Sequence, residues 1–295
     1  MKKDVVAGID KIGIKNSVSS SYHRFVKRGL SGITASSRVL PNFIIIGTVR
    51  SGSTSLYYNI CEHPAVLSAE YDEIGFFDSN FHLGINWYRS MFPTQKEMEK
   101  VRKHTNFAIT GEDTPFYFWK KEAAERIFEI IPHSKLIVIF RNPVDRAYSN
   151  YNLGIRKKTE ELSFEDAIDE EMNFMKNHTF RESVDRRRSY LSKGLYANQF
   201  KIWRDVFSEN QIHVISMEEM EKYPEETLLK VFRFLEIPDY SVKNPQKQKS
   251  ARYEKMSPKT RKRLLDYYPK VSLNEGVEIA IGWYRKNYSV FGKLI

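Results

Sequence analysis

Two short runs of apolar residues do most to limit how this chain can fold. Phe43–Gly47 (FIIIG) and Lys135–Phe140 (KLIVIF) are rich in β-branched residues, and each leads into a polar segment and then a helical pattern. Strands that are apolar on both faces are typical of a parallel sheet covered by helices. Gln211–Ser216 (QIHVIS) is interpreted as a third strand. We therefore predict an α/β protein with a P-loop-like central parallel sheet flanked by helices.

The segments around these strands carry helix signals. Pro143 is placed to occupy the first turn of a helix, a position that favours proline. Pro64 and Pro132 follow the expected ends of two other helices. We predict one folded domain over residues 41–295, preceded by a basic, flexible, serine-rich arm over residues 1–40. The expected elements are a strand at Phe107–Thr110, a short helix near Tyr22–Lys27, and helices at Ser53–Cys61, Glu122–Ile131, Pro143–Ile155, Phe164–Met175, Tyr190–Phe207, Glu225–Leu235, Arg261–Tyr268 and Leu273–Tyr288.

Charge and composition narrow the functional classes. The net charge is +10, and basic residues concentrate in two segments, residues 1–40 and 243–270, which predicts an anionic ligand or surface. The single cysteine, Cys61, excludes an intramolecular disulfide framework and a multi-cysteine zinc site. The sequence contains neither an apolar run of transmembrane length nor a secretory h-region near its start. We expect a soluble, cytoplasmic protein.

The loop after the first apolar run is predicted to bind phosphate. Small residues follow the strand, and Gly47 and Gly52 have the spacing of the P-loop pattern GxxxxGK[ST]. Ser53 replaces the lysine of that pattern, and the cation lies inside the loop instead. This favours a single phosphate bound without a metal, although a simple tight turn is the alternative. The candidate binding residues are Arg50, Ser51, Gly52, Ser53, Thr54 and Ser55.

The second apolar run supplies another candidate anchor. Arg141 follows the strand at its C-terminal end, where open α/β sheets bind ligands. Ser149 comes two helical turns later, and an arginine fork with a hydroxyl suits a terminal phosphate. A structural salt bridge is the alternative role for Arg141. Asp145 and Arg146 are interpreted as a solvated or helix-capping pair.

Together these motifs resemble the sulfotransferase superfamily, which uses 3′-phosphoadenosine 5′-phosphosulfate, and most closely its heparan-sulfate-type carbohydrate sulfotransferases. IIIGTVRSGSTSL is similar to the family's 5′-phosphosulfate loop, with Arg50 in place of the usual lysine. RNPVDRAYSNY is similar to its 3′-phosphate motif, which implies that Arg141 and Ser149 bind that phosphate. The resemblance extends from Pro41 to about Leu273 and implies a sulfotransferase-type fold.

Two further segments of the resemblance concern the cofactor. LSKGLYANQFKIW is similar to the family's KGxYAxxLxxW segment, which implies that Tyr196 contributes to cofactor binding. KSARYEKMS resembles the basic loop that closes over the cofactor, which implies the same for Lys249, Ser250 and Arg252.

The segment EIGFFD, followed by GINWY, is similar to the family's E-x-x-F-F and G-x-x-W-Y segments. The resemblance implies that Glu73 is the catalytic base and that Arg50 neutralises charge on the leaving phosphate. A carboxylate beside two phenylalanines can be desolvated, which raises its pKa, although a surface cap or salt bridge is the alternative. Gly75 stands where some relatives carry histidine, and Asp113 stands where the E-K-[ST]-P motif has lysine. These departures leave the acceptor open.

The expected reaction is transfer of a sulfuryl group to a hydroxyl or amine of a carbohydrate or glycolipid, without a metal or a nucleic-acid partner. A P-loop kinase or NTPase is the alternative enzyme, but Ser53 and the lack of an evident strand ending in a Mg²⁺-binding aspartate count against it. A polyanion-binding module and a non-catalytic cofactor binder are further alternatives. Nearby aromatic residues either stack sugar rings or form core: Phe76, Phe77, Trp87, Tyr88, Tyr117 and Trp119. The sequence predicts no oligomeric state.

Overall fold

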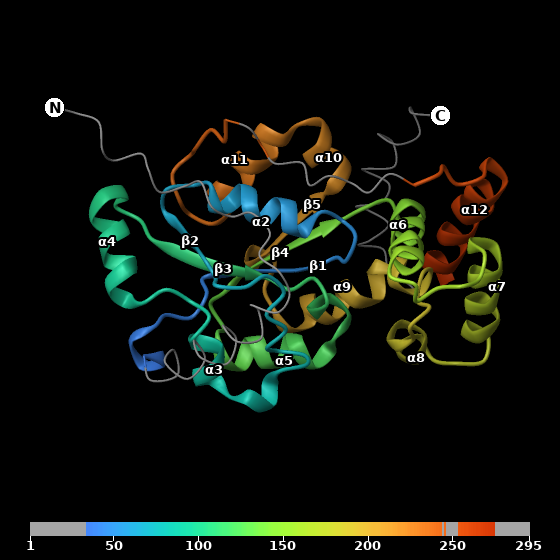
Figure 1. Ribbon diagram of the computed structural model, residues 1–295, viewed down its shortest axis with the longest axis horizontal. Coiled ribbons are helices and arrows are strands. Elements are labelled where there is room, and N and C mark those ends of the chain that lie inside the picture. Colours follow the sequence, from blue (N-terminus) through green and yellow to red (C-terminus); the bar gives the residue numbers. More distant parts are fainter. Residues whose placement is uncertain (1–33, 244, 246–252, 275–295) are drawn as a thin grey trace.

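The computed structural model describes residues 34–243, 245 and 253–274. Its centre is a five-stranded sheet in the order β2-β3-β1-β4-β5, and every neighbouring pair is parallel (Figure 1). The predicted α/β fold with a central parallel sheet is confirmed. The strands are β1 (Phe43–Gly47), β2 (Val66–Ser68), β3 (Ile109–Asp113), β4 (Lys135–Phe140) and β5 (Ile212–Ser216).

Helices cover both faces of the sheet because the central strands β1 and β4 are apolar on both faces. Ile44 and Ile46 of β1 belong to one buried cluster, which includes residues of α5 and α9. Phe43 and Ile45 belong to a second cluster, on the other face, with α2 and α11. Figure 1 shows these helix pairs on opposite sides of the strands. Their bounds are α2 (Ser53–Cys61), α5 (Lys121–Ile130), α9 (Tyr196–Val206) and α11 (Pro224–Phe234).

A helical lobe lies beyond the end of the sheet at which β1 leads into α2 and β4 into α6 (Figure 1). It has its own apolar core, which includes Val144, Phe164, Leu191 and Leu264. The lobe therefore borders the two loops that the sequence predicts to bind phosphate. Its helices are α6 (Pro143–Arg156), α7 (Phe164–Met175), α8 (Phe180–Asp185) and α12 (Pro258–Asn274).

Most predicted helices lie within one or two residues of their expected bounds, but others differ. The helix expected over Tyr190–Phe207 is divided into a 3₁₀ turn, Ser192–Gly194, and α9. Several elements were not expected, because their sequences lack a long apolar period. They are β2, α3 (Ile85–Arg89), α4 (Gln95–Thr105), α8 and α10 (Met217–Lys222).

The third strand in chain order also differs from expectation, with a consequence for the site. It was expected at Phe107–Thr110, whereas β3 spans Ile109–Asp113 and ends in two buried acidic residues. Glu112 is tolerated there because its oxygens accept hydrogen bonds from Tyr88 at 2.5 Å and Thr114 at 2.7 Å. β3 therefore ends in an aspartate that the sequence pattern did not reveal.

Only the last residues of the predicted basic arm are described, and they pack on the domain. Ala35 is buried, and the Val39 amide donates to the Pro93 carbonyl at 3.0 Å. Residues 1–33, with the helix expected near Tyr22–Lys27, lie outside the described residues, as do residues 275–288 of the last expected helix. Within the described ranges, the helices lack the combined length and apolar character needed to cross a membrane.

Because β1 and β3 are in close contact, we expect one methyl group added at Gly111 to lower the stability of the fold strongly. Gly111 pairs with Phe43, and a Cβ at Gly111 would lie 2.5 Å from two atoms of the Phe43 ring. We expect Gly111→Ala to lower the free energy of unfolding in urea by about 1–3 kcal/mol, because the core cannot take the added volume. Adding Phe43→Leu should recover part of this loss; independent, additive effects of the two changes would contradict the contact.

Candidate active site

The loop between β1 and α2 is held by its own small polar residues. The Thr48 hydroxyl donates to the Ile139 carbonyl of β4 at 3.0 Å and lies 2.6 Å from the Ser51 hydroxyl. Gly52 caps α2 with a φ of 87°, a left-handed value that glycine adopts without a steric penalty. The loop therefore ends at the N-terminus of a buried helix, where backbone N–H groups favour an anion.

Arg50 joins this loop to β4 and α6. Its Nε donates to the Ser149 hydroxyl at 3.1 Å, and Arg141 Nη1 donates to the Arg50 carbonyl at 3.0 Å. The predicted 5′-phosphosulfate residue and the two predicted 3′-phosphate residues thus form one connected group. The sequence placed them at two anchors but could not show that they touch.

Positive charge concentrates around Arg50. Desolvation, followed by the charges of Arg156, Arg141 and Arg146, lowers the pKa of Arg50, whereas Tyr253 acts in the opposite direction. A half-buried cation among other cations has a strong electrostatic preference for a bound anion. Sequence reasoning did not select Arg156, although its position seven residues after Ser149 places it on the same face of α6.

The Asp145–Arg146 pair differs from the sequence interpretation. Arg146 is fully buried, and its Nη2 donates to the Tyr190 carbonyl, while its Nε and Nη1 have no hydrogen-bond partner among the described residues. Asp145 forms an ion pair with Arg261 of α12 at 2.6 Å. The two residues are therefore neither paired with each other nor both solvated, and Arg146 adds buried positive charge beside the site.

Glu73 lies beside the end of β3. Its backbone has a φ of 51°, and its amide donates to the Asp113 carbonyl at 3.0 Å. The residue is exposed as a whole, yet desolvation and the Asp72 carboxylate raise the pKa of its carboxyl, while Lys157 lowers it. A raised carboxyl pKa suits a general base. Glu73 and Arg50 share a left-handed backbone, which is uncommon for residues other than glycine and concentrates at functional sites.

The two departures from the expected motif have structural settings of their own. Gly75 has a φ of 62°, and its amide donates to the Thr114 hydroxyl at 3.2 Å, so a histidine here would strain the backbone. Asp113 is 1% exposed, and desolvation together with Asp72, Glu73 and Glu112 raises its pKa to about 7. The Thr54 hydroxyl approaches this carboxyl and favours its charged form.

The arrangement matches a known family. The family described as "Sulfotransferase domain" matches residues 40–274, well over half of the chain. This chain belongs to the sulfotransferase domain family. The resemblance predicted from the motifs is thereby confirmed.

Individual relatives agree with this assignment. This sulfotransferase domain is 26% identical to the membrane-associated sulfotransferase kil1 of Dictyostelium discoideum, over 78% of this chain and 63% of that protein. It is 34% identical to heparan sulfate glucosamine 3-O-sulfotransferase 3A1 of Mus musculus, over 68% of this chain and 46% of that protein. The chain thus spans less than two-thirds of the length of these relatives. The crystal structure of a sulfotransferase from Alicyclobacillus acidocaldarius aligns with a TM-score of 0.60 and 26% identity, over 79% of this chain and 92% of that one.

The remaining predicted residues of this sulfotransferase domain have different settings. Tyr196 is buried, stacks on Phe140 with 4.5 Å between ring centroids, and donates from its hydroxyl to the Arg141 carbonyl at 3.0 Å. It therefore supports the strand end that carries Arg141. Ser53 and Ser55 are also buried, at the start of α2.

The predicted closing loop is only partly visible. Lys249, Ser250 and Arg252 lie outside the described residues. The chain is described again from Tyr253, whose ring lies 5.5 Å from that of Tyr148 on α6. Tyr253 also affects the pKa of Arg50. The segment next to this loop therefore borders the group of arginines formed by Arg50, Arg141, Arg146 and Arg156.

The aromatic residues of the sulfotransferase domain mostly form core. Phe76, Phe77, Tyr88, Tyr117 and Trp119 are buried, and Trp87 packs against the same cluster. Phe116 is instead 43% exposed, and the Lys193 ammonium lies 5.8 Å from its ring centroid and 5.7 Å from that of Trp119. Desolvation and Arg146 lower the pKa of Lys193 to about 8. Sequence reasoning missed this lysine, although it lies in the KGxYA segment.

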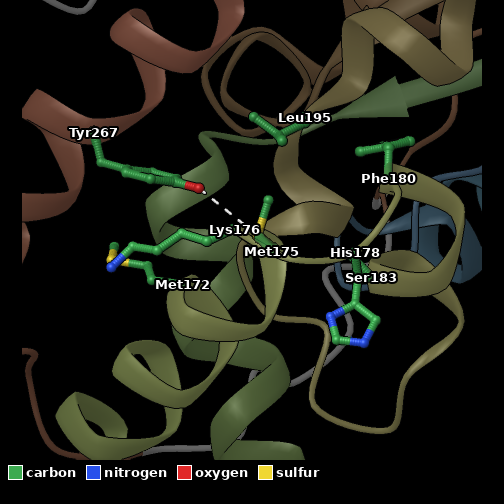
Figure 2. A pocket seen from close by; sticks show the side chains of 8 residues that line it. All are labelled: Met172, Met175, Lys176, His178, Phe180, Ser183, Leu195 and Tyr267. Carbon is green, nitrogen blue, oxygen red and sulfur yellow. Dashed lines mark hydrogen bonds between the residues drawn. The ribbon is translucent and has the colours of Figure 1, made fainter.

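A pocket in the helical lobe is separate from the loop. Its volume is about 350 Å³, and Figure 2 shows the Tyr267 hydroxyl directed at the Met175 sulfur across it, at 3.7 Å. None of the predicted nucleotide or catalytic residues lines it, so it is not the predicted cofactor site. Its lining residues are Met172, Met175, Lys176, His178, Phe180, Ser183, Leu195 and Tyr267.

Proposed function

We propose that this chain transfers a sulfuryl group from 3′-phosphoadenosine 5′-phosphosulfate to a hydroxyl or amine of a carbohydrate or glycolipid acceptor. One observation carries the proposal: Arg50, inside an anion-binding loop, is bonded to Ser149 and receives a hydrogen bond from Arg141. A nucleotide that carries two anionic groups needs two cationic anchors, and Arg50 and Arg141 supply them. The family match supports the same reaction.

In the proposed mechanism, the acceptor oxygen or nitrogen attacks the sulfur in line with the departing phosphate oxygen. Glu73 takes the acceptor proton, a new bond to sulfur forms, and the bond between sulfur and the bridging oxygen breaks. Arg50 and the amides at the start of α2 offset the charge that develops on the leaving 5′-phosphate. Arg141 and Ser149 hold the 3′-phosphate, and the segment that contains Lys249, Ser250 and Arg252 covers the nucleotide.

The acceptor class rests on relatives and on one surface feature. The mouse relative is named for a heparan sulfate glucosamine acceptor, which supports a carbohydrate. The exposed Phe116 ring beside Lys193 supplies an aromatic face and a cation, which together suit an acidic or hydroxyl-rich sugar. A cytoplasmic location stays a prediction, and the relative kil1 is named as membrane-associated.

Transfer of labelled sulfate tests the reaction. The full chain is incubated with ³⁵S-labelled co-substrate and, in parallel, with γ-³²P-labelled ATP, each with a panel of desulfated polysaccharides and glycolipids. We expect ³⁵S to enter an acceptor and ³²P not to do so. Incorporation of ³²P alone would favour the kinase alternative. Nucleotide binding without either transfer would favour a non-catalytic binder.

We expect Arg141 to determine how strongly the enzyme prefers a nucleotide with a 3′-phosphate over one without it. Wild type should bind adenosine 3′,5′-bisphosphate more tightly than adenosine 5′-monophosphate, by about tenfold to a hundredfold, because a charge-assisted hydrogen bond contributes about 1.5–3 kcal/mol. Arg141→Ala should reduce this preference when both affinities are measured by titration calorimetry. Arg233→Ala is a matched control, because Arg233 pairs with Asp239 on the surface. An unchanged preference in Arg141→Ala would assign the 3′-phosphate to other residues.

A further inference from the structure

Glu171 of α7 is a buried carboxylate that the proposed mechanism does not use. The residue is fully buried, and it belongs to the helical lobe rather than to either predicted phosphate loop (Figure 1). Moving a carboxylate out of water is costly unless hydrogen bonds or opposite charges compensate it. The contacts of Glu171 therefore indicate which part of the chain depends on its charge.

The compensation comes from one short stretch of chain, residues 190–192. The amides of Tyr190 and Leu191 both donate to Glu171 Oε2 at 2.7 Å. The Ser192 amide donates to Oε1 at 2.9 Å, and the Ser192 hydroxyl donates to the same oxygen at 2.7 Å. Four donors converge on the two oxygens, so the ionised carboxylate fits this setting and holds three consecutive residues in place.

Two further side chains hold this segment. Arg146 of α6 is fully buried and donates from Nη2 to the Tyr190 carbonyl. The Tyr268 hydroxyl of α12 lies 3.3 Å from the Leu191 carbonyl and 3.4 Å from the Pro143 carbonyl. The segment is therefore fixed both to the helical lobe and to the first turn of α6.

The same segment leads to the strand end that carries Arg141. Tyr196 begins α9, and its hydroxyl donates to the Arg141 carbonyl at 3.0 Å. Only the 3₁₀ turn Ser192–Gly194 and Leu195 separate the contacts of Glu171 from Tyr196. Because so few residues intervene, loss of the Glu171 contacts would affect Tyr196 and, through it, the backbone of Arg141.

We propose that Glu171 is a positioning residue for the 3′-phosphate: it fixes the 190–192 segment and thereby places the Tyr196 hydroxyl against the Arg141 carbonyl. This inference rests on the proposed function, in which Arg141 binds the 3′-phosphate. The 5′-phosphosulfate loop has an anchor of its own, because the Thr48 hydroxyl donates to the Ile139 carbonyl of β4. Glu171 should therefore affect binding of the 3′-phosphate more than binding of the 5′-phosphate.

Two nucleotides isolate this effect on the full chain. Titration calorimetry gives the affinities for adenosine 3′,5′-bisphosphate and adenosine 5′-monophosphate, and their ratio measures what the 3′-phosphate contributes. Glutamine keeps the shape of Glu171 but turns an NH₂ group toward donors that the carboxylate accepted. We expect Glu171→Gln to lower the ratio by about threefold to thirtyfold, the range for residues that act without touching the ligand. Glu170→Gln is the matched control and should retain the wild-type ratio, because its partly exposed carboxylate pairs with Arg186 and Arg188.

A double variant separates positioning from a general loss of stability. Tyr196→Phe removes the bond to the Arg141 carbonyl and should lower the ratio as well. If Glu171 acts through Tyr196, the two changes together should lower the ratio little more than the larger single change. A general loss of stability would instead weaken both nucleotides alike and leave the ratio at its wild-type value. Single effects that multiply in the double variant, or a wild-type ratio in Tyr196→Phe, would overturn the route through Tyr196.

The outcomes also separate this inference from the proposed function. Ser192→Ala removes one donor to Glu171 and serves as a second, milder variant. If wild type prefers the bisphosphate and neither Glu171→Gln nor Ser192→Ala lowers that preference, this inference is overturned while the proposed function stands. If wild type shows no preference, the proposed function fails and this inference fails with it. Circular dichroism identifies an unfolded variant, and Ser192→Ala decides if Glu171→Gln is unfolded.

Discussion

Arg50→Ala is expected to slow sulfuryl transfer by about 10²–10³-fold while the protein stays folded. This is the range found when a single donor to a developing oxyanion is removed. Arg50 lies in the loop, bonds Ser149 and is half-buried among other arginines, so its charge is poorly screened by water. Alanine at this left-handed position costs no more backbone energy than arginine, which keeps the comparison free of a backbone effect.

The measurement is kcat at saturating nucleotide and acceptor, with thermal unfolding recorded for each variant. Arg50→Lys keeps a charge but not the fork that reaches Ser149, so it should fall between wild type and Arg50→Ala. Arg233→Ala again serves as the control for a surface arginine. A kcat of Arg50→Ala equal to that of wild type would remove Arg50 from the proposed mechanism.

Glu73→Gln is expected to reduce kcat by about 10²–10⁴-fold, the usual contribution of a positioned general base. Glutamine has nearly the same shape, and the backbone hydrogen bond to the Asp113 carbonyl does not involve the side chain. Nucleotide binding should therefore be unchanged. Glu99→Gln, on the exposed surface of α4, is the matched control. Near-normal transfer by Glu73→Gln would move the role of base to another carboxylate, with Asp113 the first candidate.

The pH dependence gives an independent check on Glu73. A base must be deprotonated, so kcat should rise with pH through the pKa of Glu73, which desolvation and Asp72 raise above its ordinary value. Asp72→Asn removes one raising charge and should shift this acidic limb to lower pH. The limb should be absent from the residual activity of Glu73→Gln. If neither Asp72→Asn nor Glu73→Gln changes the acidic limb, that limb reflects the titration of a group other than Glu73.

The fold was predictable where burial leaves a continuous pattern in the sequence. β1 and β4 are apolar on both faces, and Pro143 marks the start of α6, so these elements lie where expected. β3 was misplaced because Glu112 and Asp113 do not resemble strand residues, and only tertiary contacts from Tyr88 and Thr114 make room for Glu112. α3 and α4 were missed because neither sequence contains an apolar run that would indicate a helix.

The candidate site was predictable as two separate loops but not as one assembly. The motifs identified Arg50, Arg141 and Ser149, yet the bond from Arg50 to Ser149 depends on how β1 and α6 pack. Arg156 was missed because its role depends on the face of α6 that meets the loop. The setting of Asp113 likewise follows from the pairing of β3 with β1, which no local pattern encodes.

The strand order has a consequence for how the protein acquires its activity during synthesis. Among the described strands, β1 is made first but takes the central position, between β3 and β4, and β5 is added at one edge much later. Contacts between residues so far apart in the chain make folding slow and keep the early strand unpaired until later ones emerge. Arg50 cannot meet Ser149 before α6 has been translated and has docked. The contact between Arg50 and Ser149 therefore reports that the chain has docked as far as α6, and a truncated chain that ends before α6 would expose β1 to aggregation.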